Sequence, residues 1–400
     1  MKVALLIGDG MADYPVEELD GLTPLEAAET PNMDRLAREG TVGLVRTVPE
    51  GTAPGSDIAN LNLLGYDVSR YYTGRAPLEC ASRNIDLTAE QIAFRCNLVT
   101  VADETMVDYS AGHIGSEEAA ELIADIDRQL GDSSRKFYAG VSYRHLLVAD
   151  PGGAKWETNL TCTPPHDIVG QPITSYLPQG ENQQLFRKMM LESQKILSEH
   201  AVNLRRIRSG KRPATMIWLW GHGKRPSMPT FQQLYAMKGA VISAVDLIRG
   251  LGKYAGLNVI DVPGATGYFD TNYSGKAGHG IDSLKKSDFL FLHVEAPDEA
   301  GHAGNMQEKI RAIENFDRLI VGPITDALSG SEPARLLVLP DHATPLSVRT
   351  HVSDPVPFVA HGAAIPTNGC SGFSEAQAGR TRLYIEKGFE LLPAYLKRDT

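Results

Sequence analysis

Two neighbouring residues, Asp341 and His342, follow a short apolar run at the point where a buried strand would end. Pro340 stands directly before them and closes the run 336–339. Open α/β sheets bind ligands at the carboxyl ends of their strands, and carboxylate and imidazole groups are both metal ligands. The pair is therefore a candidate metal site, although a surface hydrogen bond between an Asp and a His would leave the same two residues side by side.

The same arrangement occurs at two further places in the chain. The apolar run 1–7 precedes Asp9, and the run 289–294 precedes Asp298, with His302 four residues further on. If these runs are neighbouring strands of one parallel sheet, their carboxylates meet at one edge. Each Asp could instead cap a turn or a helix. That alternative does not account for the histidines that accompany two of them.

A serine at a predicted helix start is the candidate nucleophile. Gly and Pro residues precede Ser56, and a helix-compatible stretch follows it to residue 64. One interpretation is an N-cap, which is the common role of an isolated serine in this position. The other is a nucleophile that a metal ion deprotonates and that the N–H groups of the helix start assist. Small neighbouring residues would let a phosphate approach the backbone.

Length, charge and cysteine spacing limit the classes of protein to which the chain can belong. The chain has 400 residues, a formal net charge of −10 and ordinary apolar and charged fractions, which predict a globular protein of two or three units. The acidic balance argues against nucleic acid or an anionic membrane as a partner. The four cysteines are far apart, and no signal peptide or membrane-spanning run is apparent, so we expect reduced thiols and a cytoplasmic protein.

The chain order predicts an inserted domain. Asp9 and Ser56 precede a long segment of strand and helix patterns, whereas Asp298 and the later candidate ligands follow it. We therefore expect a discontinuous metal-binding domain over residues 1–65 and 266–400. The segment 66–265 would form an inserted substrate-binding or transferase domain.

Helices are predicted over residues 31–39 and 181–208, among others. Residues 31–39 follow Thr30, a favourable N-cap, with Pro31 at the first helical position and Gly40 after the last. Residues 181–208 have the pattern of one long amphipathic helix with a basic end.

Five motifs together resemble the alkaline phosphatase superfamily and, within it, the archaeal-type phosphoglycerate mutases that are independent of 2,3-bisphosphoglycerate. The motifs occur in the family's order over nearly the whole chain and are IGDG, TPNMDRLAREG, GSDIANLNLLGY, EAPDEAGH and LPDH. The resemblance implies an α/β fold. It would be a three-layer, alkaline-phosphatase-like domain with a mostly parallel central sheet, interrupted by a smaller α/β or α+β domain.

The resemblance also implies roles for particular residues. One divalent metal would be held by Asp9, Ser56, Asp341 and His342. The other would be held by Asp298, His302 and His351. Ser56 would be the nucleophile and Lys276 a further catalytic group. The residues expected to bind substrate are His113, Arg144, Arg225 and Lys276, with Arg75 as an additional candidate. Manganese is the expected metal, with zinc, cobalt and magnesium as alternatives, and 2,3-bisphosphoglycerate is not required.

The implied activity is the interconversion of 3-phosphoglycerate and 2-phosphoglycerate, a step of glycolysis and gluconeogenesis, through a phosphoserine. The partner would be this small phosphorylated substrate, without nucleic acid or membrane, and the protein could form a homo-oligomer. Alternatives are a homoserine kinase-like phosphotransferase, a metal-dependent phosphatase and an inactive interaction protein. The last is disfavoured because the clear ligand and nucleophile positions are all filled.

Overall fold

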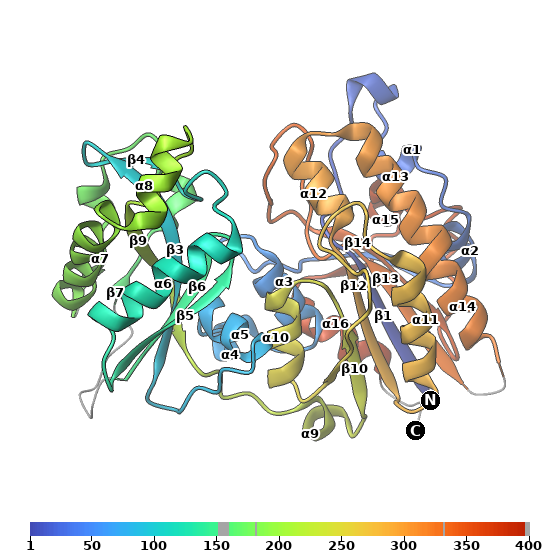
Figure 1. Cartoon of the computed structure of the whole chain (residues 1–400). Coiled ribbons are helices and arrows are strands. Elements are labelled where there is room, and N and C mark those ends of the chain that lie inside the picture. Colours follow the sequence, from blue (N-terminus) through green and yellow to red (C-terminus); the bar gives the residue numbers. More distant parts are fainter. Residues whose placement is uncertain (151–159, 181, 331–332, 397–400) are drawn as a thin grey trace. The chain divides into compact units, whose positions relative to one another are not determined.

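The computed structural model describes residues 1–150, 160–180, 182–330 and 333–396, and the chain divides into two compact units (Figure 1). Unit 1 comprises Met1–Tyr72 and Ser227–Thr400, and unit 2 comprises Thr73–Pro226. Unit 1 is thus discontinuous in sequence, whereas unit 2 is one continuous segment.

The segment 227–265 belongs to unit 1, although the sequence analysis placed it in the insertion. Its strands β10 (Gly239–Ile242) and β11 (Asn258–Val259) run parallel to each other, and β10 pairs with β12 (Phe289–Val294). The residues of β10 are all buried. A local sequence pattern predicts a strand but not its partner, which is why the predicted boundary at 265 was wrong for these two strands.

Among the described residues, unit 1 contains an eight-stranded sheet with the order β11-β10-β12-β1-β13-β14-β2-β15. The strands from β11 to β13 are parallel, β14 is antiparallel to both of its neighbours, and β15 is parallel to β2. The mostly parallel sheet confirms the predicted α/β fold class. The strands not yet delimited are β1 (Lys2–Gly8), β2 (Thr41–Val45), β13 (Ala334–Leu339), β14 (Val356–Gly362) and β15 (Tyr384–Ile385).

Helices cover both faces of this sheet and make three layers (Figure 1). On one face Leu6 and Leu292 pack into a core cluster with Phe316. On the other face Phe289 stacks on Phe231, with ring centroids 4.3 Å apart. Alternate residues of a strand face opposite sides, so each central strand contributes to both cores.

The helices of unit 1 include two short 3-10 turns and one π-helix. Their bounds are η1 (Glu17–Leu19), α1 (Pro24–Ala27), α2 (Pro31–Glu39), α3 (Ser56–Leu63), α4 (Val68–Tyr71), α9 (Phe231–Tyr235), α10 (Asp246–Tyr254), α11 (Tyr273–Leu284), α12 (Ala296–Ala303), α13 (Met306–Phe316), the π-helix η4 (Asp317–Val321), α14 (Gly322–Leu328), α15 (Glu375–Arg380), η5 (Gly388–Glu390) and α16 (Leu391–Leu396).

Unit 2 is built around strand β3 (Ile92–Ala102), which pairs antiparallel with β4, β6 and β9. Along β3, Phe94 and Cys96 belong to the core cluster that includes residues of α6 and α7. Arg95 and Asn97 alternate with them and face the opposite side of the sheet. The other strands are β4 (Thr105–Asp108), β5 (Arg135–Val141), β6 (Arg144–Ala149) and β9 (Met216–Lys224), with β7 (Leu160–Thr161) and β8 (Gln179–Gly180) forming a separate pair.

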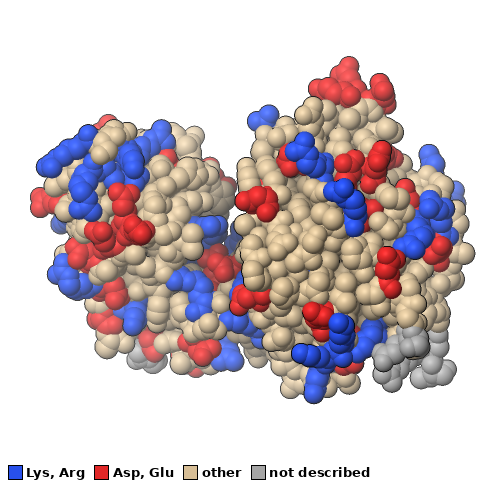
Figure 2. Space-filling view, turned by 45° about the vertical axis from the view of Figure 1, so that its right-hand side comes forward, with Lys and Arg blue, Asp and Glu red and all other residues tan. Residues whose placement is uncertain are grey.

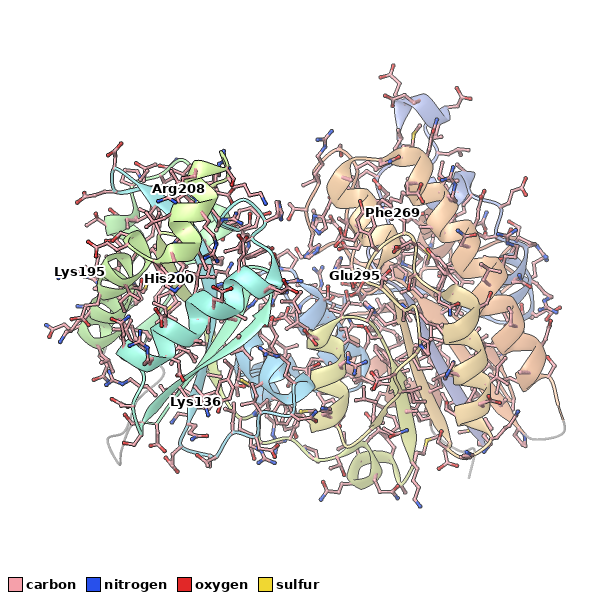
Figure 3. All side chains as sticks on the ribbon, in the orientation of Figure 1. Lys136, Lys195, His200, Arg208, Phe269 and Glu295 are labelled. Carbon is pink, nitrogen blue, oxygen red and sulfur yellow. The ribbon has the colours of Figure 1, made fainter. Side chains whose placement is uncertain are left out.

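The helix predicted over 181–208 is interrupted, and its first residue lies outside the described part of the chain. Helix α7 (Gln183–Ser198) ends before His200, and α8 (Ala201–Arg208) begins after it (Figure 3). The Nδ1 atom of His200 accepts a hydrogen bond from the N–H of Val202, and its Nε2 lies 3.3 Å from Asp125. His200 therefore caps a new helix instead of continuing the old one. The remaining helices of unit 2 are α5 (Arg75–Ser82), α6 (Ser116–Leu130), η2 (Pro165–Ile168) and η3 (Ile173–Tyr176).

Within the described ranges, no helix is long and apolar enough to span a bilayer. On the face drawn in Figure 2, acidic and basic side chains are intermingled over the surface.

Candidate metal centre and substrate-binding residues

The segments that follow β1, β12 and β13 meet at the carboxyl edge of the unit 1 sheet. Strand β1 is paired in parallel with β12 on one side and with β13 on the other. Asp9, Asp298 and Asp341 follow these three strands, and all three are buried. The convergence expected from the three apolar runs is therefore confirmed.

Gly10 allows the end of β1 to lie against the start of α12. Its φ of 62° lies in the left-handed region, and a Cβ atom there would lie 2.7 Å from the Cα atom of Asp298. Only glycine fits such a close approach without a shift of the backbone. The N–H of Gly10 donates to Oδ1 of Asp341 at 3.2 Å, so the IGDG motif also orients this carboxylate.

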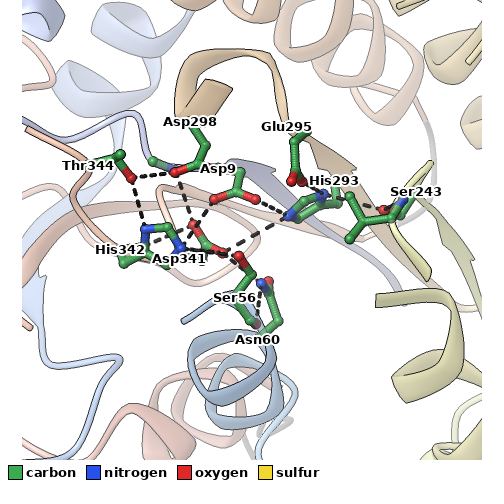
Figure 4. A network of polar contacts seen from close by, with 12 residues as sticks. Asp9, Ser56, Asn60, Ser243, His293, Glu295, Asp298, Asp341, His342 and Thr344 are labelled. Atoms are coloured by element: carbon green, nitrogen blue, oxygen red, sulfur yellow. Dashed lines mark hydrogen bonds and ion pairs between the residues drawn. The ribbon is translucent and has the colours of Figure 1, made fainter. Parts of the chain in front are cut away.

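Ser56 lies in the first of two groups of candidate ligands (Figure 4). It is the first residue of α3, and its Oγ is 3.2 Å from Nε2 of His342. The same imidazole nitrogen is 3.4 Å from Oδ1 of Asp9 and 3.6 Å from Oδ2 of Asp341. A hydroxyl, an imidazole and two carboxylates therefore face one buried point.

Asn60 connects this group to the helix that carries the serine. Its Nδ2 donates to Oδ2 of Asp341 at 2.7 Å and to the carbonyl oxygen of Ser56 at 2.8 Å. The side chain of Asn60 therefore holds the carboxylate of Asp341, which follows β13, against the first turn of α3.

The second group is formed by Asp298, His302 and His351. Oδ2 of Asp298 is 3.2 Å from Nε2 of His302, and its Oδ1 is 3.3 Å from Nε2 of His351. Nδ1 of His302 is 3.0 Å from the carbonyl oxygen of Arg349, which accepts a hydrogen bond from it. Nε2 of His302 then faces the carboxylate of Asp298. The two Nε2 atoms lie 2.9 Å apart, so a shared proton or a cation is needed between them.

Thr344 joins the two groups. Its hydroxyl donates to Oδ1 of Asp298 and lies 3.2 Å from Nδ1 of His342 (Figure 4). The rings of His342 and His351 are also in contact, with centroids 4.0 Å apart. The structure thus brings all seven predicted metal ligands into one site within unit 1.

The buried carboxylates of this site fit divalent cations. Neither carboxylate oxygen of Asp9 has a hydrogen-bond partner among the described residues, although both are buried. Burial raises the pKa of Asp9 well above its ordinary value, and the charges of Asp341, Glu295 and Asp298 raise it further. Three triads of ligand atoms lie within 4.8 Å of one another, namely Asp298–His342–His351, Asp9–His293–Asp341 and Asp9–Glu295–Asp298. Positive charge at this place would satisfy the unpaired oxygens and offset the repulsion.

The pKa of Asp298 is shifted in the opposite direction to that of Asp9. Burial raises its pKa, but hydrogen bonds from His302 and His351 outweigh that effect and hold it well below the ordinary value. Burial by itself lowers the pKa of His302, because it disfavours the charged imidazole. The hydrogen bond to Asp298 and the charge of that carboxylate outweigh burial and raise the pKa of His302 to about 9. His302 therefore carries positive charge beside the carboxylate of Asp298.

Lys276, predicted as a catalytic and substrate-binding residue, comes from α11 and is completely buried. Its Nζ donates to the carbonyl oxygen of His293 at 3.2 Å. Burial lowers its pKa to about 8, while the carboxylate of Glu295 acts in the opposite direction. Lys276 therefore belongs to the same sheet edge as the candidate ligands.

The predicted substrate residues His113, Arg144 and Arg225 all lie in unit 2. The ring of His113 is 6.1 Å from that of Tyr143, and the guanidinium of Arg144 lies 5.7 Å from the same ring. Arg225 follows β9, where it donates to the carbonyl oxygen of Leu87. Across β3, Arg144 is paired with residue 97 and Lys224 with residue 92, so the backbones of Arg144 and Arg225 are about 17 Å apart along the strand direction. The structure therefore places His113 and Arg144 beside the same tyrosine ring, whereas the backbone of Arg225 lies apart from that of Arg144.

Arg95 is a cationic residue that the sequence analysis missed. It forms an ion pair with Glu79 at 3.0 Å and stacks on Trp220, with its guanidinium carbon 4.2 Å from the ring centroid. Burial lowers its pKa most, the carboxylate of Glu79 opposes this, and the charges of Arg75 and Arg144 add to it. Three arginines thus gather around one acid in unit 2, which leaves excess positive charge suited to an anionic ligand.

The other missed residues are His293 and Glu295 at the end of β12 and Asn60 on α3. His293 and Arg95 share a signal that was available in the sequence, because each is a charged or titratable residue inside a mostly apolar strand. Glu295 stands directly after its strand, like Asp9 (Figure 3). Asn60 has no such signal, since an asparagine in a helix is usually solvated.

Known proteins resemble this chain over its whole length. The model of the 2,3-bisphosphoglycerate-independent phosphoglycerate mutase family matches residues 37–203. The protein of that name from Methanosarcina barkeri is 51% identical over 400 residues, covering 99% of this chain and 100% of the relative. A probable enzyme of the same name from Geobacter sulfurreducens is 49% identical over 403 residues, with 100% of both chains covered.

Two solved structures agree with the sequence comparison. A protein from Pyrococcus horikoshii has a TM-score of 0.84 and 30% identity, covering 100% of this chain and 98% of the other. The cofactor-independent phosphoglycerate mutase from Thermoplasma acidophilum has a TM-score of 0.67 and 28% identity, covering 99% and 100%. With half of its residues identical to full-length relatives and with the motifs in their expected places, the chain belongs to the 2,3-bisphosphoglycerate-independent phosphoglycerate mutases, the family that its motifs predicted.

Proposed function

We propose that this chain interconverts 3-phosphoglycerate and 2-phosphoglycerate through a phosphoserine on Ser56, without 2,3-bisphosphoglycerate. The observation that carries the proposal is the position of Ser56 at the start of α3, with its Oγ 3.2 Å from His342 and beside buried carboxylates. Membership in the mutase family supports the same substrate. The proposed enzyme works on a small phosphorylated substrate in the cytoplasm.

The proposed metal centre holds two divalent cations. Asp9, Ser56, Asp341 and His342 hold one, and Asp298, His302 and His351 hold the other. Mn²⁺ is the proposed ion, because mixed imidazole and carboxylate ligands suit Mn²⁺, Co²⁺ or Zn²⁺ better than Mg²⁺, which prefers oxygen. Bound cations would lower the pKa of the serine hydroxyl and neutralise charge on the phosphoryl oxygens.

The chemistry of Ser56 balances without an external donor. Its Oγ forms a bond to phosphorus while the bond from phosphorus to the C3 oxygen of the substrate breaks, and the serine proton ends on that oxygen. Glycerate stays bound and presents its C2 oxygen to the phosphoserine. Reversal of the first step then returns the phosphoryl group and restores the serine hydroxyl. The N–H groups at the start of α3 favour the negative charge on the phosphoryl oxygens.

Cationic residues would hold the substrate during this exchange. In unit 1 Lys276 is the proposed contact, with its ammonium group at the edge of the sheet. In unit 2 the proposed contacts are His113, Arg144 and Arg225. Arg95 and Arg75 add to the positive charge near Arg144. Arginine suits a carboxylate or phosphate because its guanidinium can form two parallel hydrogen bonds to it.

A coupled assay tests the reaction. Protein loaded with Mn²⁺ and supplied with 3-phosphoglycerate, but no 2,3-bisphosphoglycerate, is expected to feed enolase with 2-phosphoglycerate. Release of inorganic phosphate without the isomer would instead establish a phosphatase. Consumption of ATP with homoserine would establish a kinase, and either result would contradict the proposal.

The nucleophile is tested with a matched pair of serine variants. Ser56→Ala is expected to abolish turnover and the covalent phosphoryl group that intact-protein mass spectrometry detects after acid quenching. Ser69→Ala, on the exposed part of α4, is expected to keep both. Turnover that survives in Ser56→Ala would remove Ser56 from the proposed role.

A further inference from the structure

His293 stands at the centre of the sheet edge without an assigned role. It lies in β12 within the apolar run FLFLHV, and its side chain is completely buried. Its Nε2 points toward the carboxylates of the metal centre (Figure 4), 3.0 Å from Oδ2 of Asp9 and 4.0 Å from Oδ2 of Asp341. A buried histidine facing two buried acids requires an explanation.

A direct hydrogen bond does not provide this explanation. Nε2 of His293 and both carboxylate oxygens of Asp9 have no hydrogen-bond partner among the described residues, despite the short distance between them. Two ligand atoms 3.0 Å apart, each about 2.1 Å from one cation, subtend an angle of about 90° at it, which is the angle between adjacent ligands of an octahedral site. The geometry of the unpaired atoms therefore fits a shared cation.

The opposite side of the imidazole ring is arranged as in a metal-binding histidine. Its Nδ1 is 3.4 Å from Oγ of Ser243 and 3.8 Å from Oε2 of Glu295. The Ser243 oxygen already accepts a hydrogen bond from the N–H of Val245 at 3.0 Å. With the ring proton on Nδ1, directed at this oxygen and carboxylate, the lone pair of Nε2 points into the site. Metal-binding histidines are commonly fixed in this way by their second nitrogen.

His342, an expected ligand, has the same arrangement on the other side of Asp9. Its Nε2 is 3.4 Å from Oδ1 of Asp9, and its Nδ1 is 3.2 Å from the hydroxyl of Thr344. His293 repeats this pattern with Oδ2 of Asp9 and the hydroxyl of Ser243. The two imidazoles therefore flank one carboxylate, each with a hydroxyl group behind it.

We propose that His293 is a further ligand of the divalent cation held by Asp9 and Asp341. The inference rests on the metal centre of the proposed function, but it does not depend on the substrate. A second imidazole at this cation favours ions that accept nitrogen, such as Mn²⁺, Co²⁺ and Zn²⁺, over Mg²⁺. Ser243 and Glu295 position the ring.

Metal binding, measured without substrate, tests the proposal. Wild type and His293→Ala are stripped with chelator, titrated with Mn²⁺ in a calorimeter, and assayed for bound metal after gel filtration. We expect His293→Ala to lose one bound ion or to bind it at least about 10-fold more weakly, since even supporting residues of metal ligands change affinity by 10–100-fold. His361→Ala is the matched control. Its imidazole pairs with Glu39 and lies opposite Leu336, far from the carboxyl end of β13, so wild-type binding is expected.

Visible absorption of Co²⁺-loaded protein gives a readout that reports on coordination. Loss of a nitrogen ligand is expected to change the spectrum of His293→Ala and to leave that of His361→Ala unchanged. If His293→Ala does not fold, as judged by circular dichroism in chelator, His293→Asn is examined in the same way. Wild-type affinity, stoichiometry and Co²⁺ spectrum in a folded His293 variant would overturn the proposal.

A third variant separates this inference from the metal centre itself. Asp341→Asn is expected to lose the ion whether or not His293 is a ligand. If Asp341→Asn binds metal normally, the proposed metal centre is wrong. If Asp341→Asn loses the ion and the His293 variants keep it, the centre stands and only the role of His293 is wrong.

Discussion

Asn60 joins parts of the site that are far apart in the sequence. Its amide holds Asp341, which is 281 positions away, and the first turn of the helix that carries Ser56. Asn62 is also buried on α3, but its amide donates to the carbonyl oxygen of Thr47 and not to the site. Two similar side chains on one helix therefore have different roles, one in positioning a carboxylate and the other in holding a loop.

This difference gives a prediction at the residue scale. Asn60→Ala and Asn62→Ala are each expected to lower the free energy of unfolding by about 1–3 kcal/mol, because each leaves a buried partner without its hydrogen bond. Only Asn60→Ala is expected to weaken Mn²⁺ binding, by about 10–100-fold, since Asp341 loses its support. Chemical denaturation and calorimetric titration measure the two effects. Equal metal affinities in the two variants would contradict a positioning role for Asn60.

The residues of the site were predictable in part. Asp9, Asp298 and Asp341 each follow an apolar run within a few residues, and residues that follow the carboxyl ends of parallel strands meet at one edge of the sheet. Asn60 and Thr344 were not predictable, because their contacts depend on which side chain arrives from another strand. The family resemblance grouped Arg225 with Arg144 as substrate-binding residues, but the register of β3 separates their backbones.

At the scale of elements, helix α2 has the predicted bounds but a different capping residue. Thr30 occupies the N-cap position and makes no side-chain capping bond to the described residues. The carboxylate of Asp317 instead accepts from the N–H groups of Asn32 and Met33, at 3.2 and 2.7 Å. Asp317 begins the π-helix η4, so a distant helix supplies the cap. The local pattern therefore fixes where a helix starts, whereas the fold decides what satisfies its first N–H groups.

The substitution Asp317→Ala tests this cap. It is expected to lower the free energy of unfolding by about 1–3 kcal/mol, because two N–H groups at the start of α2 lose their acceptor. Thr30→Val removes only the hydroxyl group that makes no capping bond and is expected to change stability by less than about 0.5 kcal/mol. Thermal or denaturant unfolding compares the two. A larger loss in Thr30→Val than in Asp317→Ala would show that the capping assignment is wrong.

At the scale of the whole molecule, the chain contains a continuous unit with its own core. Unit 2 runs from Thr73 to Pro226, and its core cluster is drawn from its own sheet and helices. The sequence pattern predicts an insertion, but over the longer range 66–265. Its limits depend on strand partners, because β10 looks like any short apolar strand until it pairs with β12.

The continuity of unit 2 leads to a third prediction. A fragment of residues 73–226 is expected to fold alone and to unfold cooperatively, since its buried residues pack on one another. Circular dichroism during denaturation measures this. A fragment of residues 66–265, the range expected from sequence, carries β10 and β11 without β12 and is expected to aggregate more readily through their unpaired edge. A disordered 73–226 fragment would contradict the independence of the unit.

The central place of β1 has a consequence for biosynthesis. Strand β1 is flanked by β12 and β13, and Val3 pairs with Phe289 and Arg335, which are synthesised much later than Val3. Until the ribosome has made those strands, the apolar residues 3–7 have neither neighbour, and an unpaired apolar edge promotes association with other chains. Strand β1 therefore stays unpaired while the residues between it and β12 are synthesised, and chaperone binding to this segment would limit its association with other chains.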